Sequence, residues 1–203
     1  MSMSDQRSAE WYAQRLGHAT GSRAGDILAG KETMARRGYI TQLVTERLTG
    51  ASQDFFVNAD MQRGIDLEPV ARAAYQASHE LVDEVGFIKH PTILWFGASP
   101  DGFVGSEGLL ELKCPRSTTH VDYLQSKKPP AKYVPQMLAQ LSCTKRKWVD
   151  FVSFDDRMPE HLQLHVVRFQ PTEEDIEKFE SKVREFLSDV NNLMEQLCPS
   201  HTK

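Results

Sequence analysis

The most regular pattern of hydrophobic and polar positions lies near the end of the chain. Apolar residues recur there on one stripe at the 3.6-residue period of an α-helix, namely Ile176, Phe179, Val183, Phe186, Leu187, Val190, Met194 and Leu197. The pattern predicts a long C-terminal helix over residues 171–198 that packs this face against the rest of the protein. Any apolar surface that stays uncovered could serve contacts between subunits.

The first third of the chain also has the pattern of helices. Helices are expected over residues 6–14, 22–28, 33–48 and 60–78. Thr20-Gly21-Ser22 offers cap residues for the second of these helices, and Gly50 ends the third. We therefore expect a mainly helical N-terminal part over residues 1–82.

After this part the pattern changes to that of β-strands. The β-rich segments are residues 85–89, 92–97, 108–114, 148–154 and 161–169, and helical patterns over 121–126 and 130–142 lie among them. Ser99-Pro-Asp-Gly102 is a turn sequence. Because no repeat or linker divides the chain, we predict a single α/β domain over residues 1–203. Its central mixed β-sheet, flanked by helices, would form a core over residues 83–170.

Composition limits the class of protein. Hydrophobic residues make up 40% and charged residues 26% of the 203 residues, which excludes a disordered, collagen-like or coiled-coil chain. No apolar run is long enough to cross a membrane and the N-terminus is polar, so we expect a cytoplasmic protein without a signal peptide. Cys114, Cys143 and Cys198 lack the spacing of a zinc site or a disulfide framework and are expected to be reduced thiols.

The net charge of −4 conceals an uneven distribution of charge. Between Lys113 and Trp148 the chain has eight Lys or Arg residues and a single acid, Asp122. Residues 172–203 instead hold eight acids and four bases. This asymmetry favours one surface that meets a polyanion and another that does not. The alternative is that both segments are ordinary solvated helix faces.

The strand over residues 108–114 carries the candidate chemistry. Side chains alternate across a strand, so Glu111 and Lys113 share one face while Leu110 and Leu112 share the other. A hairpin-like return would bring Asp101, in the preceding turn, beside Glu111. Two carboxylates near a lysine suit Mg²⁺ or Mn²⁺, and the lysine would orient or deprotonate an attacking water. The alternative is a plain turn followed by an exposed Glu-Lys pair.

Five ordered blocks resemble a known family. Pro100-Asp101, nine residues and then Glu111-Leu112-Lys113 resemble the PD-(D/E)xK nuclease signature. The blocks 11–22, 63–73, 99–103, 110–115 and 133–140 occur in the order expected for the phage lambda exonuclease family of recombination nucleases. The resemblance covers about residues 8–169 and implies a restriction-endonuclease-like α/β core.

The resemblance implies a role for several residues of the site. Asp101 and Glu111 would bind the metal together with the Leu112 carbonyl, and Lys113 would be the catalytic lysine. Glu68 would be an additional acid that acts on the metal directly or through water, and Gln136 would be an active-site glutamine. An alternative for Glu68 is a solvated carboxylate in the first turn of a helix, because Pro69 must either open a helix or kink one.

The resemblance also implies where DNA binds. Arg15, Thr20 and Ser22 would hold the 5'-phosphate of the digested strand, since guanidinium and hydroxyl groups suit phosphate. Their alternative is helix capping by Thr20 and Ser22, with Arg15 on the surface. Trp11 is expected in the core. Contacts to the DNA backbone would come from four basic residues, Arg116, Lys127, Lys128 and Lys132.

The implied function is that of a Mg²⁺-dependent exonuclease. It would degrade one strand of linear double-stranded DNA from the 5' end, and leave 3' overhangs for a single-strand annealing protein. The family also implies a ring-shaped homotrimer and a phage-encoded protein in a bacterial cell. Two alternatives remain: a structure-specific or restriction-type endonuclease, and an inactive module that binds DNA ends. The intact Asp101, Glu111 and Lys113 argue against the second.

Overall fold

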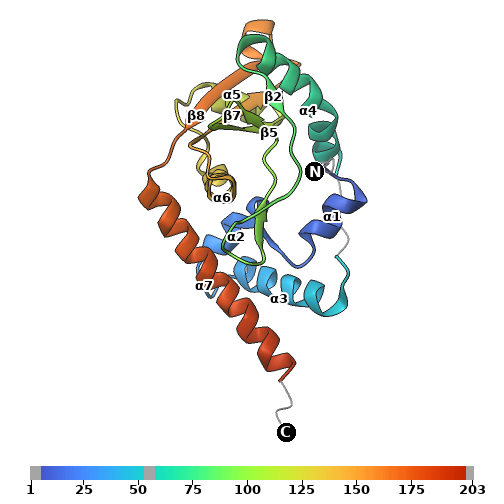
Figure 1. Ribbon diagram of the computed structural model, residues 1–203. Coiled ribbons are helices and arrows are strands. Elements are labelled where there is room, and N and C mark those ends of the chain that lie inside the picture. The colour runs from blue at the N-terminus through green and yellow to red at the C-terminus, as the bar shows by residue number, and fades with distance from the viewer. Residues whose placement is uncertain (1–5, 53–57, 200–203) are drawn as a thin grey trace.

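The computed structural model describes residues 6–52 and 58–199, and the expectations for residues 1–5 lie outside this range. Figure 1 shows the arrangement of the elements. The helices are α1 (Ala9–Arg15), α2 (Ala24–Leu28), α3 (Met34–Thr49), α4 (Ala59–Ser78), α5 (Ser117–Leu124), α6 (Val134–Thr144) and α7 (Glu173–Leu197), with short 3₁₀ turns η1 (Gly21–Arg23), η2 (Ala131–Tyr133) and η3 (Glu160–Leu162). The strands are β1 (Ala19–Thr20), β2 (Val82–Asp83), β3 (Ile88–Lys89), β4 (Phe96–Ala98), β5 (Gly102–Val104), β6 (Gly108–Lys113), β7 (Trp148–Phe154) and β8 (Leu164–Phe169).

The strands form two mixed sheets rather than the single central sheet that the sequence predicts. Five strands pair in the order β2-β5-β6-β7-β8, in which only β6 and β7 are parallel. Three short strands pair in the order β1-β4-β3. The chain passes from the small sheet into the large one through Ser99-Pro100-Asp101, where the missing N–H of Pro100 favours the end of a ladder. Asp101 therefore lies at the junction of the two sheets.

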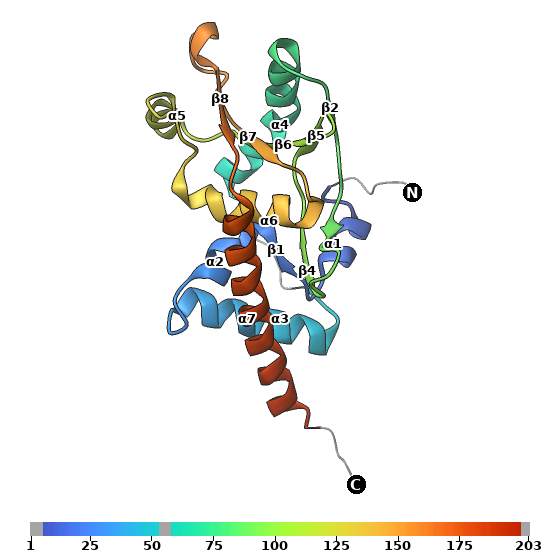
Figure 2. The same ribbon diagram turned by 60° about the vertical axis from the view of Figure 1, so that its left-hand side comes forward.

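Helices cover both faces of the large sheet at β6. On one face Leu110 and Leu112 pack with Ala71 and Tyr75 of α4. On the other face Leu109 packs with residues of α6. The expected alternation along this strand is confirmed. Figure 2 shows that α6 lies between the large sheet and the small one, so this helix contacts both.

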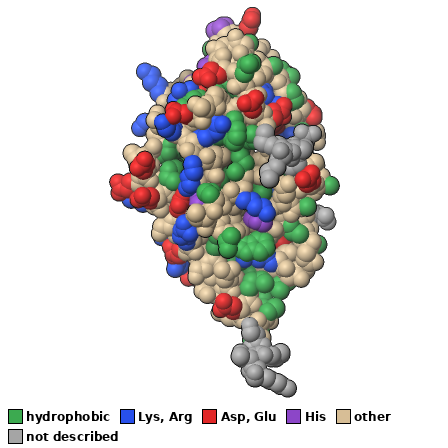
Figure 3. All heavy atoms as spheres, viewed as in Figure 1, with side chains coloured by type: hydrophobic (Ala, Val, Ile, Leu, Met, Phe, Trp, Pro, Cys, Tyr) green, Lys and Arg blue, Asp and Glu red, His purple; other side chains and the backbone are tan. Residues whose placement is uncertain are grey.

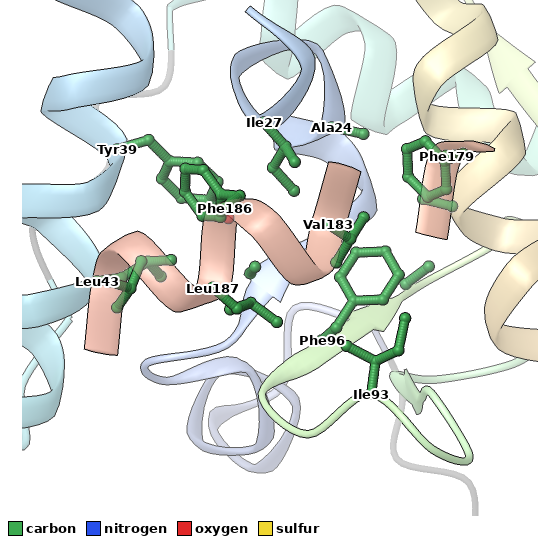
Figure 4. Close-up of a cluster of buried hydrophobic side chains, with 14 of the residues drawn as sticks. Ala24, Ile27, Tyr39, Leu43, Ile93, Phe96, Phe179, Val183, Phe186 and Leu187 are labelled. Atoms are coloured by element: carbon green, nitrogen blue, oxygen red, sulfur yellow. The ribbon is translucent and has the colours of Figure 1, made fainter. Parts of the chain in front are cut away.

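A separate cluster of buried residues, away from the large sheet, joins α7 to the N-terminal helices. Phe186 and Leu187 of α7 lie against Tyr39 and Leu43 of α3, with Ile27 of α2 beside them (Figure 4). Helix α7 begins with a capping box between Thr172 and Asp175. The predicted stripe is buried along most of the helix, whereas Leu197 at its end is 56% exposed.

Several predicted boundaries were wrong. The strand expected over 92–97 is formed only at Phe96–Ala98, because a turn follows Pro91. The strand expected over 85–89 is reduced to Ile88–Lys89, and the helix expected over 121–126 begins at Ser117. Among the described residues, no helix has the length and apolar character that a membrane span requires.

Truncation of Phe186 to alanine tests the α7 interface. The side chain is 0% exposed, so the Phe186→Ala variant should lose about 3 to 5 kcal/mol of unfolding free energy in urea. The control Leu197→Ala, at the exposed end of the same helix, should change the unfolding free energy by no more than about 0.5 kcal/mol. Equal losses for both variants would contradict this packing.

Candidate active site

A cavity of about 620 Å³ opens at the carboxyl end of β6. Its walls come from α1, α4, the Ser99–Asp101 junction, the end of β6 and the start of α6. Eight residues expected in the site line it, namely Arg15, Ser22, Glu68, Asp101, Leu112, Lys113, Arg116 and Gln136. The fold thus brings together residues from all five blocks of the sequence.

Asp101 and Glu111 are brought together by the β5–β6 hairpin. The Asp101 backbone N–H donates to the Leu110 carbonyl at 3.0 Å, and the Leu112 N–H donates to Asp101 Oδ2 at 2.6 Å. Glu111 is fully buried, and its Oε1 pairs with the Lys113 ammonium. The predicted return of the chain and the shared face of Glu111 and Lys113 are confirmed.

The electrostatics of this group show an excess of negative charge. Burial, followed by the charge of Glu111, raises the pKa of Asp101 to about 8. Burial alone would lower the pKa of Lys113, but the Glu111 and Asp101 carboxylates outweigh it and raise that pKa above its ordinary value. Lys113 is therefore a cation that holds its proton, and a further cation would relieve the repulsion between the carboxylates.

The donor set fits Mg²⁺. This ion is commonly held by one or two carboxylates and keeps several waters, which Asp101, Glu111 and an open cavity allow. Among the described residues no three Asp, Glu, His or Cys side chains gather closely enough to hold a metal by themselves. A site built on two carboxylates thus depends on water and backbone carbonyls for its other ligands.

Glu68 faces the cavity from the middle of α4. It accepts from Arg72 at 3.2 Å and from Arg7 at 2.5 Å, and its charge helps to raise the pKa of Asp101. The first-turn alternative for Glu68 is wrong, because α4 begins more than two turns earlier, at Ala59, and continues through Pro69. A role for Glu68 through water stays a prediction.

Two glutamines of α6 face this region. Gln136 lines the cavity as expected. Gln140, one helical turn later and fully buried, donates from Nε2 to Glu111 Oε2. The sequence interpretation missed Gln140, although its spacing of four residues from Gln136 places both on one face of a helix.

Arg15 lies in a small polar subsite of the same cavity. Its guanidinium stacks 3.9 Å from the ring centroid of Trp11 and donates to Ser99 Oγ at 3.3 Å and Ser22 Oγ at 3.4 Å. Trp11, which is buried as expected, donates from Nε1 to Ser99 Oγ at 3.0 Å. Burial lowers the pKa of Arg15. A half-buried guanidinium between two hydroxyl groups is suited to a phosphate.

Thr20 and Ser99 differ from the expectation. Thr20 does not line the catalytic cavity, since its side chain is buried behind Ser22, with Oγ1 3.4 Å from the Tyr39 hydroxyl. Ser99 occupies the place beside Arg15 that Thr20 was expected to hold. The position of Ser99 in the turn sequence, two residues before Asp101, could have indicated that it lies in the site.

Ion pairs to the buried carboxylate of Asp155 hold the loop that follows β6 in place. Arg63 of α4 donates to Asp155 Oδ1 at 3.1 Å and to the Pro115 carbonyl at 3.4 Å. Arg157 donates to the same Asp155 oxygen at 2.7 Å. Burial alone would raise the pKa of Asp155, but its hydrogen bonds to Arg157 and Ser117 outweigh that effect and hold the pKa below the usual range. Arg116, the next residue of the loop, pairs with Asp60 at the exposed rim.

The last lysines of the basic segment pair with acids and lie near the opposite end of β6 from Lys113. Lys145 pairs with Glu180 at 2.8 Å, and Lys147 pairs with Glu107. These residues precede β7, and its first residue pairs with Gly108, roughly 17 Å along the strand from Lys113 at about 3.3 Å per residue. On the face in Figure 3, Lys and Arg side chains alternate with Asp and Glu. The expectation of one polyanion-binding surface over this whole segment stays a prediction.

Lys127, Lys128 and Lys132 lie outside the cavity. Lys127 and Lys128 are exposed in the loop after α5. Lys132 lines a smaller groove of about 170 Å³ that shares Ser22 and Gln136 with the catalytic cavity. This groove extends the cavity toward Lys132.

Comparison with known proteins identifies the family. The family model described as the YqaJ-like viral recombinase domain matches residues 10–147. The chain belongs to this family. It is similar to an alkaline exonuclease from Laribacter hongkongensis, with 44% identity, a TM-score of 0.88 and coverage of 94% of this chain and 96% of the other. A second structure of that exonuclease, in complex with dAMP, matches equally well.

A more distant structural match shares the fold of this chain. A phage-related exonuclease from Haemophilus somnus shares 18% identity and a TM-score of 0.71 over 89% of this chain and 96% of the other. No curated protein matches the chain. For this member of the YqaJ-like family, the resemblance and the fold class that the sequence indicated are confirmed.

The raised pKa of Asp101 gives a prediction about stability. The pKa is about 8 in the folded protein against an ordinary value of 3.8. The folded state thus binds this proton more tightly, and the resulting stabilisation is complete below pH 4 and lost as pH rises through about 8. In EDTA at pH 8, the neutral Asp101→Asn variant should therefore be more stable than the wild type by at least about 1 kcal/mol. Mg²⁺ should stabilise the wild type more than the variant.

Thermal unfolding at pH 5 and pH 8, with EDTA or Mg²⁺, measures both effects. The control is Asp60→Asn, because Asp60 is exposed and its hydrogen bond to Arg116 lowers its pKa. That variant should gain no stability at pH 8. A wild type that responds to neither pH nor Mg²⁺ would contradict the charge excess.

Proposed function

We propose that the protein is a Mg²⁺-dependent exonuclease that degrades one strand of linear double-stranded DNA from its 5' end and leaves a 3' overhang. One observation carries the proposal: Asp101 and Lys113, the latter paired with the buried Glu111, line the same cavity as the Arg15–Ser22–Ser99 subsite. An enzyme that cuts beside a phosphorylated end needs both a reacting site and a terminal phosphate site. The similar exonuclease that binds dAMP, a deoxynucleoside monophosphate, supports this interpretation.

The residues of the site have separable tasks. Asp101 and Glu111 would hold Mg²⁺, with the Leu112 carbonyl as a further ligand. When bound, Mg²⁺ supplies positive charge that acidifies a water and stabilises a phosphoryl oxygen; Mn²⁺ can supply the same chemistry. The protonated Lys113 would orient the attacking water and stabilise charge on the phosphate. Gln136 faces the same space from α6 and would contact the scissile group.

The direction of digestion follows from the terminal phosphate site. Water attacks the phosphorus between the first and second nucleotides, and the bond from phosphorus to the first nucleotide's O3' breaks. The products are a 5'-mononucleotide and a strand with a new 5'-phosphate. That phosphate is the group that Arg15, Ser22 and Ser99 would bind next.

The cellular role and assembly rest on the family resemblance. We place the chain as a single nuclease domain over residues 1–203, acting on DNA in the cytoplasm as a homotrimer. Its 3' overhangs would be used by a single-strand annealing protein. The exposed Leu94 and Trp95 side chains supply apolar surface that such subunit contacts could cover.

Three DNA substrates test the proposed activity. Purified protein should degrade linear duplex in Mg²⁺, leave closed circular DNA intact, and do nothing in EDTA. Cutting of the closed circle would indicate an endonuclease instead. Binding to linear DNA without hydrolysis in Mg²⁺ or Mn²⁺ would indicate an inactive end-binding module.

Arg15 gives a prediction about end recognition. The wild type should digest a 5'-phosphorylated duplex about tenfold or more faster than its 5'-hydroxyl counterpart, because a hydrogen bond between charged groups contributes about 1.5 to 3 kcal/mol. Arg15→Ala should remove most of this preference. The control Arg37→Ala removes an exposed arginine of α3 that pairs with Glu32, and should keep the preference. Equal wild-type rates on both ends would exclude a phosphate subsite.

The lysines outside the cavity give a prediction about binding. Replacement of Lys127, Lys128 and Lys132 by alanine should weaken the binding of duplex DNA whatever its base sequence. Each lost phosphate contact should flatten the slope of log K against log salt by about 0.9. Binding is measured with Ca²⁺ in place of Mg²⁺ to suppress cleavage. The control replaces Lys178 and Lys182, whose partners are acids of α7 itself. An unaltered slope for the triple variant would mean that its lysines face solvent.

A further inference from the structure

Behind the catalytic strand, α6 places a buried amide against Glu111. Gln140 is 0% exposed and donates from Nε2 to Glu111 Oε2. The helix is held in place on both sides of this contact, because Met137 and Leu141 pack with Leu109 and Phe151 of the large sheet. The position of the amide relative to Glu111 is therefore fixed by the core and not by solvent.

Burial of this amide lowers the stability of the folded protein. Its own oxygen, Gln140 Oε1, is shielded from solvent and has no hydrogen-bond partner within residues 6–52 and 58–199. An unsatisfied buried acceptor reduces stability, and an apolar side chain of the same length would avoid that loss. The compensating contribution is the bond from Nε2 to Glu111.

The bond determines the orientation of the Glu111 carboxylate. The terminal torsion of a glutamate side chain has a broad, two-fold distribution, so a carboxylate without partners can rotate. Here Gln140 contacts Oε2, while Lys113 pairs with Oε1. With both oxygens in contact, the plane of the carboxylate is fixed beside Asp101.

The neutral charge of glutamine is also important. Because Lys113 already pairs with Glu111, a second lysine or arginine at position 140 would cancel the negative charge that remains on the two carboxylates, and a further acid would repel them. A neutral donor leaves the negative charge of Glu111 available to a cation while it holds the carboxylate in place.

We infer that Gln140 is a positioning residue that holds the Glu111 carboxylate in the orientation needed to bind a divalent cation. The inference rests on the proposed function, since it concerns the metal site of that reaction. Partners of metal-binding carboxylates commonly change metal affinity by 10- to 100-fold when they are removed. Gln140 would act on metal affinity through Glu111 without touching the DNA.

Mn²⁺ binding to the DNA-free protein tests the inference. Gln140→Met keeps the length and burial of the side chain but removes the donor. Isothermal titration should show a Kd for Mn²⁺ about tenfold or more higher than in the wild type. The melting temperature in EDTA shows whether the variant is folded, because loss of the bond to Glu111 Oε2 is only partly offset by removal of the unsatisfied oxygen. The concentration of Mg²⁺ that gives half-maximal cleavage should rise by a similar factor.

A control and a second variant separate positioning from general damage to α6. Met137→Leu repacks a buried residue of the same helix without a change in polarity, and should keep the Mn²⁺ Kd within about twofold. If Gln140→Met does not fold, Gln140→Leu takes its place with the same expected result. Wild-type affinity in a folded Gln140 variant would overturn the inference alone. Absence of Mn²⁺ binding in the wild type would overturn the proposed function as well.

Discussion

Asp101, on the wall of the cavity, and the fully buried Glu111 lie close together, and the repulsion between their charges is the constraint on which the site depends. The β5–β6 hairpin enforces this approach through the bonds of Asp101 to the Leu110 and Leu112 backbone. Lys113 offsets part of the charge, and Gln140 holds Glu111 without neutralising it. The remaining negative charge favours the binding of a divalent cation, because a bound cation reduces the repulsion between the two carboxylates in the folded protein.

The end-recognition subsite is coupled to this pair through the backbone. Ser99, which contacts both Trp11 and Arg15, is separated from Asp101 only by Pro100. A shift of this short junction would move both the phosphate subsite and the metal ligand. The two sheets meet there, so the division of the strands into two sheets, absent from the sequence prediction, places the proposed subsite for the DNA end next to Asp101, the proposed metal ligand.

The sequence predicts the parts of the structure that depend on local periodicity. The stripe of α7 and the alternation along β6 each span enough residues for the pattern to be distinct, and both are confirmed. Strands of two or three residues, such as β1, β3 and β4, contain too few positions for alternation, so the separate sheet that they form was missed. Contacts between distant residues were missed for another reason. The bond from Arg63 to Asp155 joins residues 92 apart in sequence, and no local spacing indicates it. Gln140 was within a recognised block, but its partner is defined only by how α6 packs on the sheet.

The central claim is that water attacks the phosphate that follows the 5'-terminal nucleotide, and digestion in water enriched in ¹⁸O tests it directly. The substrate is a 5'-phosphorylated linear duplex whose strands carry adenine only at the 5' end. Mass spectrometry of the early products should find dAMP without ¹⁸O, because its phosphate was present before cleavage, and one ¹⁸O in each nucleotide released afterwards. Early products that all carry ¹⁸O and contain no dAMP would show digestion from the 3' end and would contradict the account.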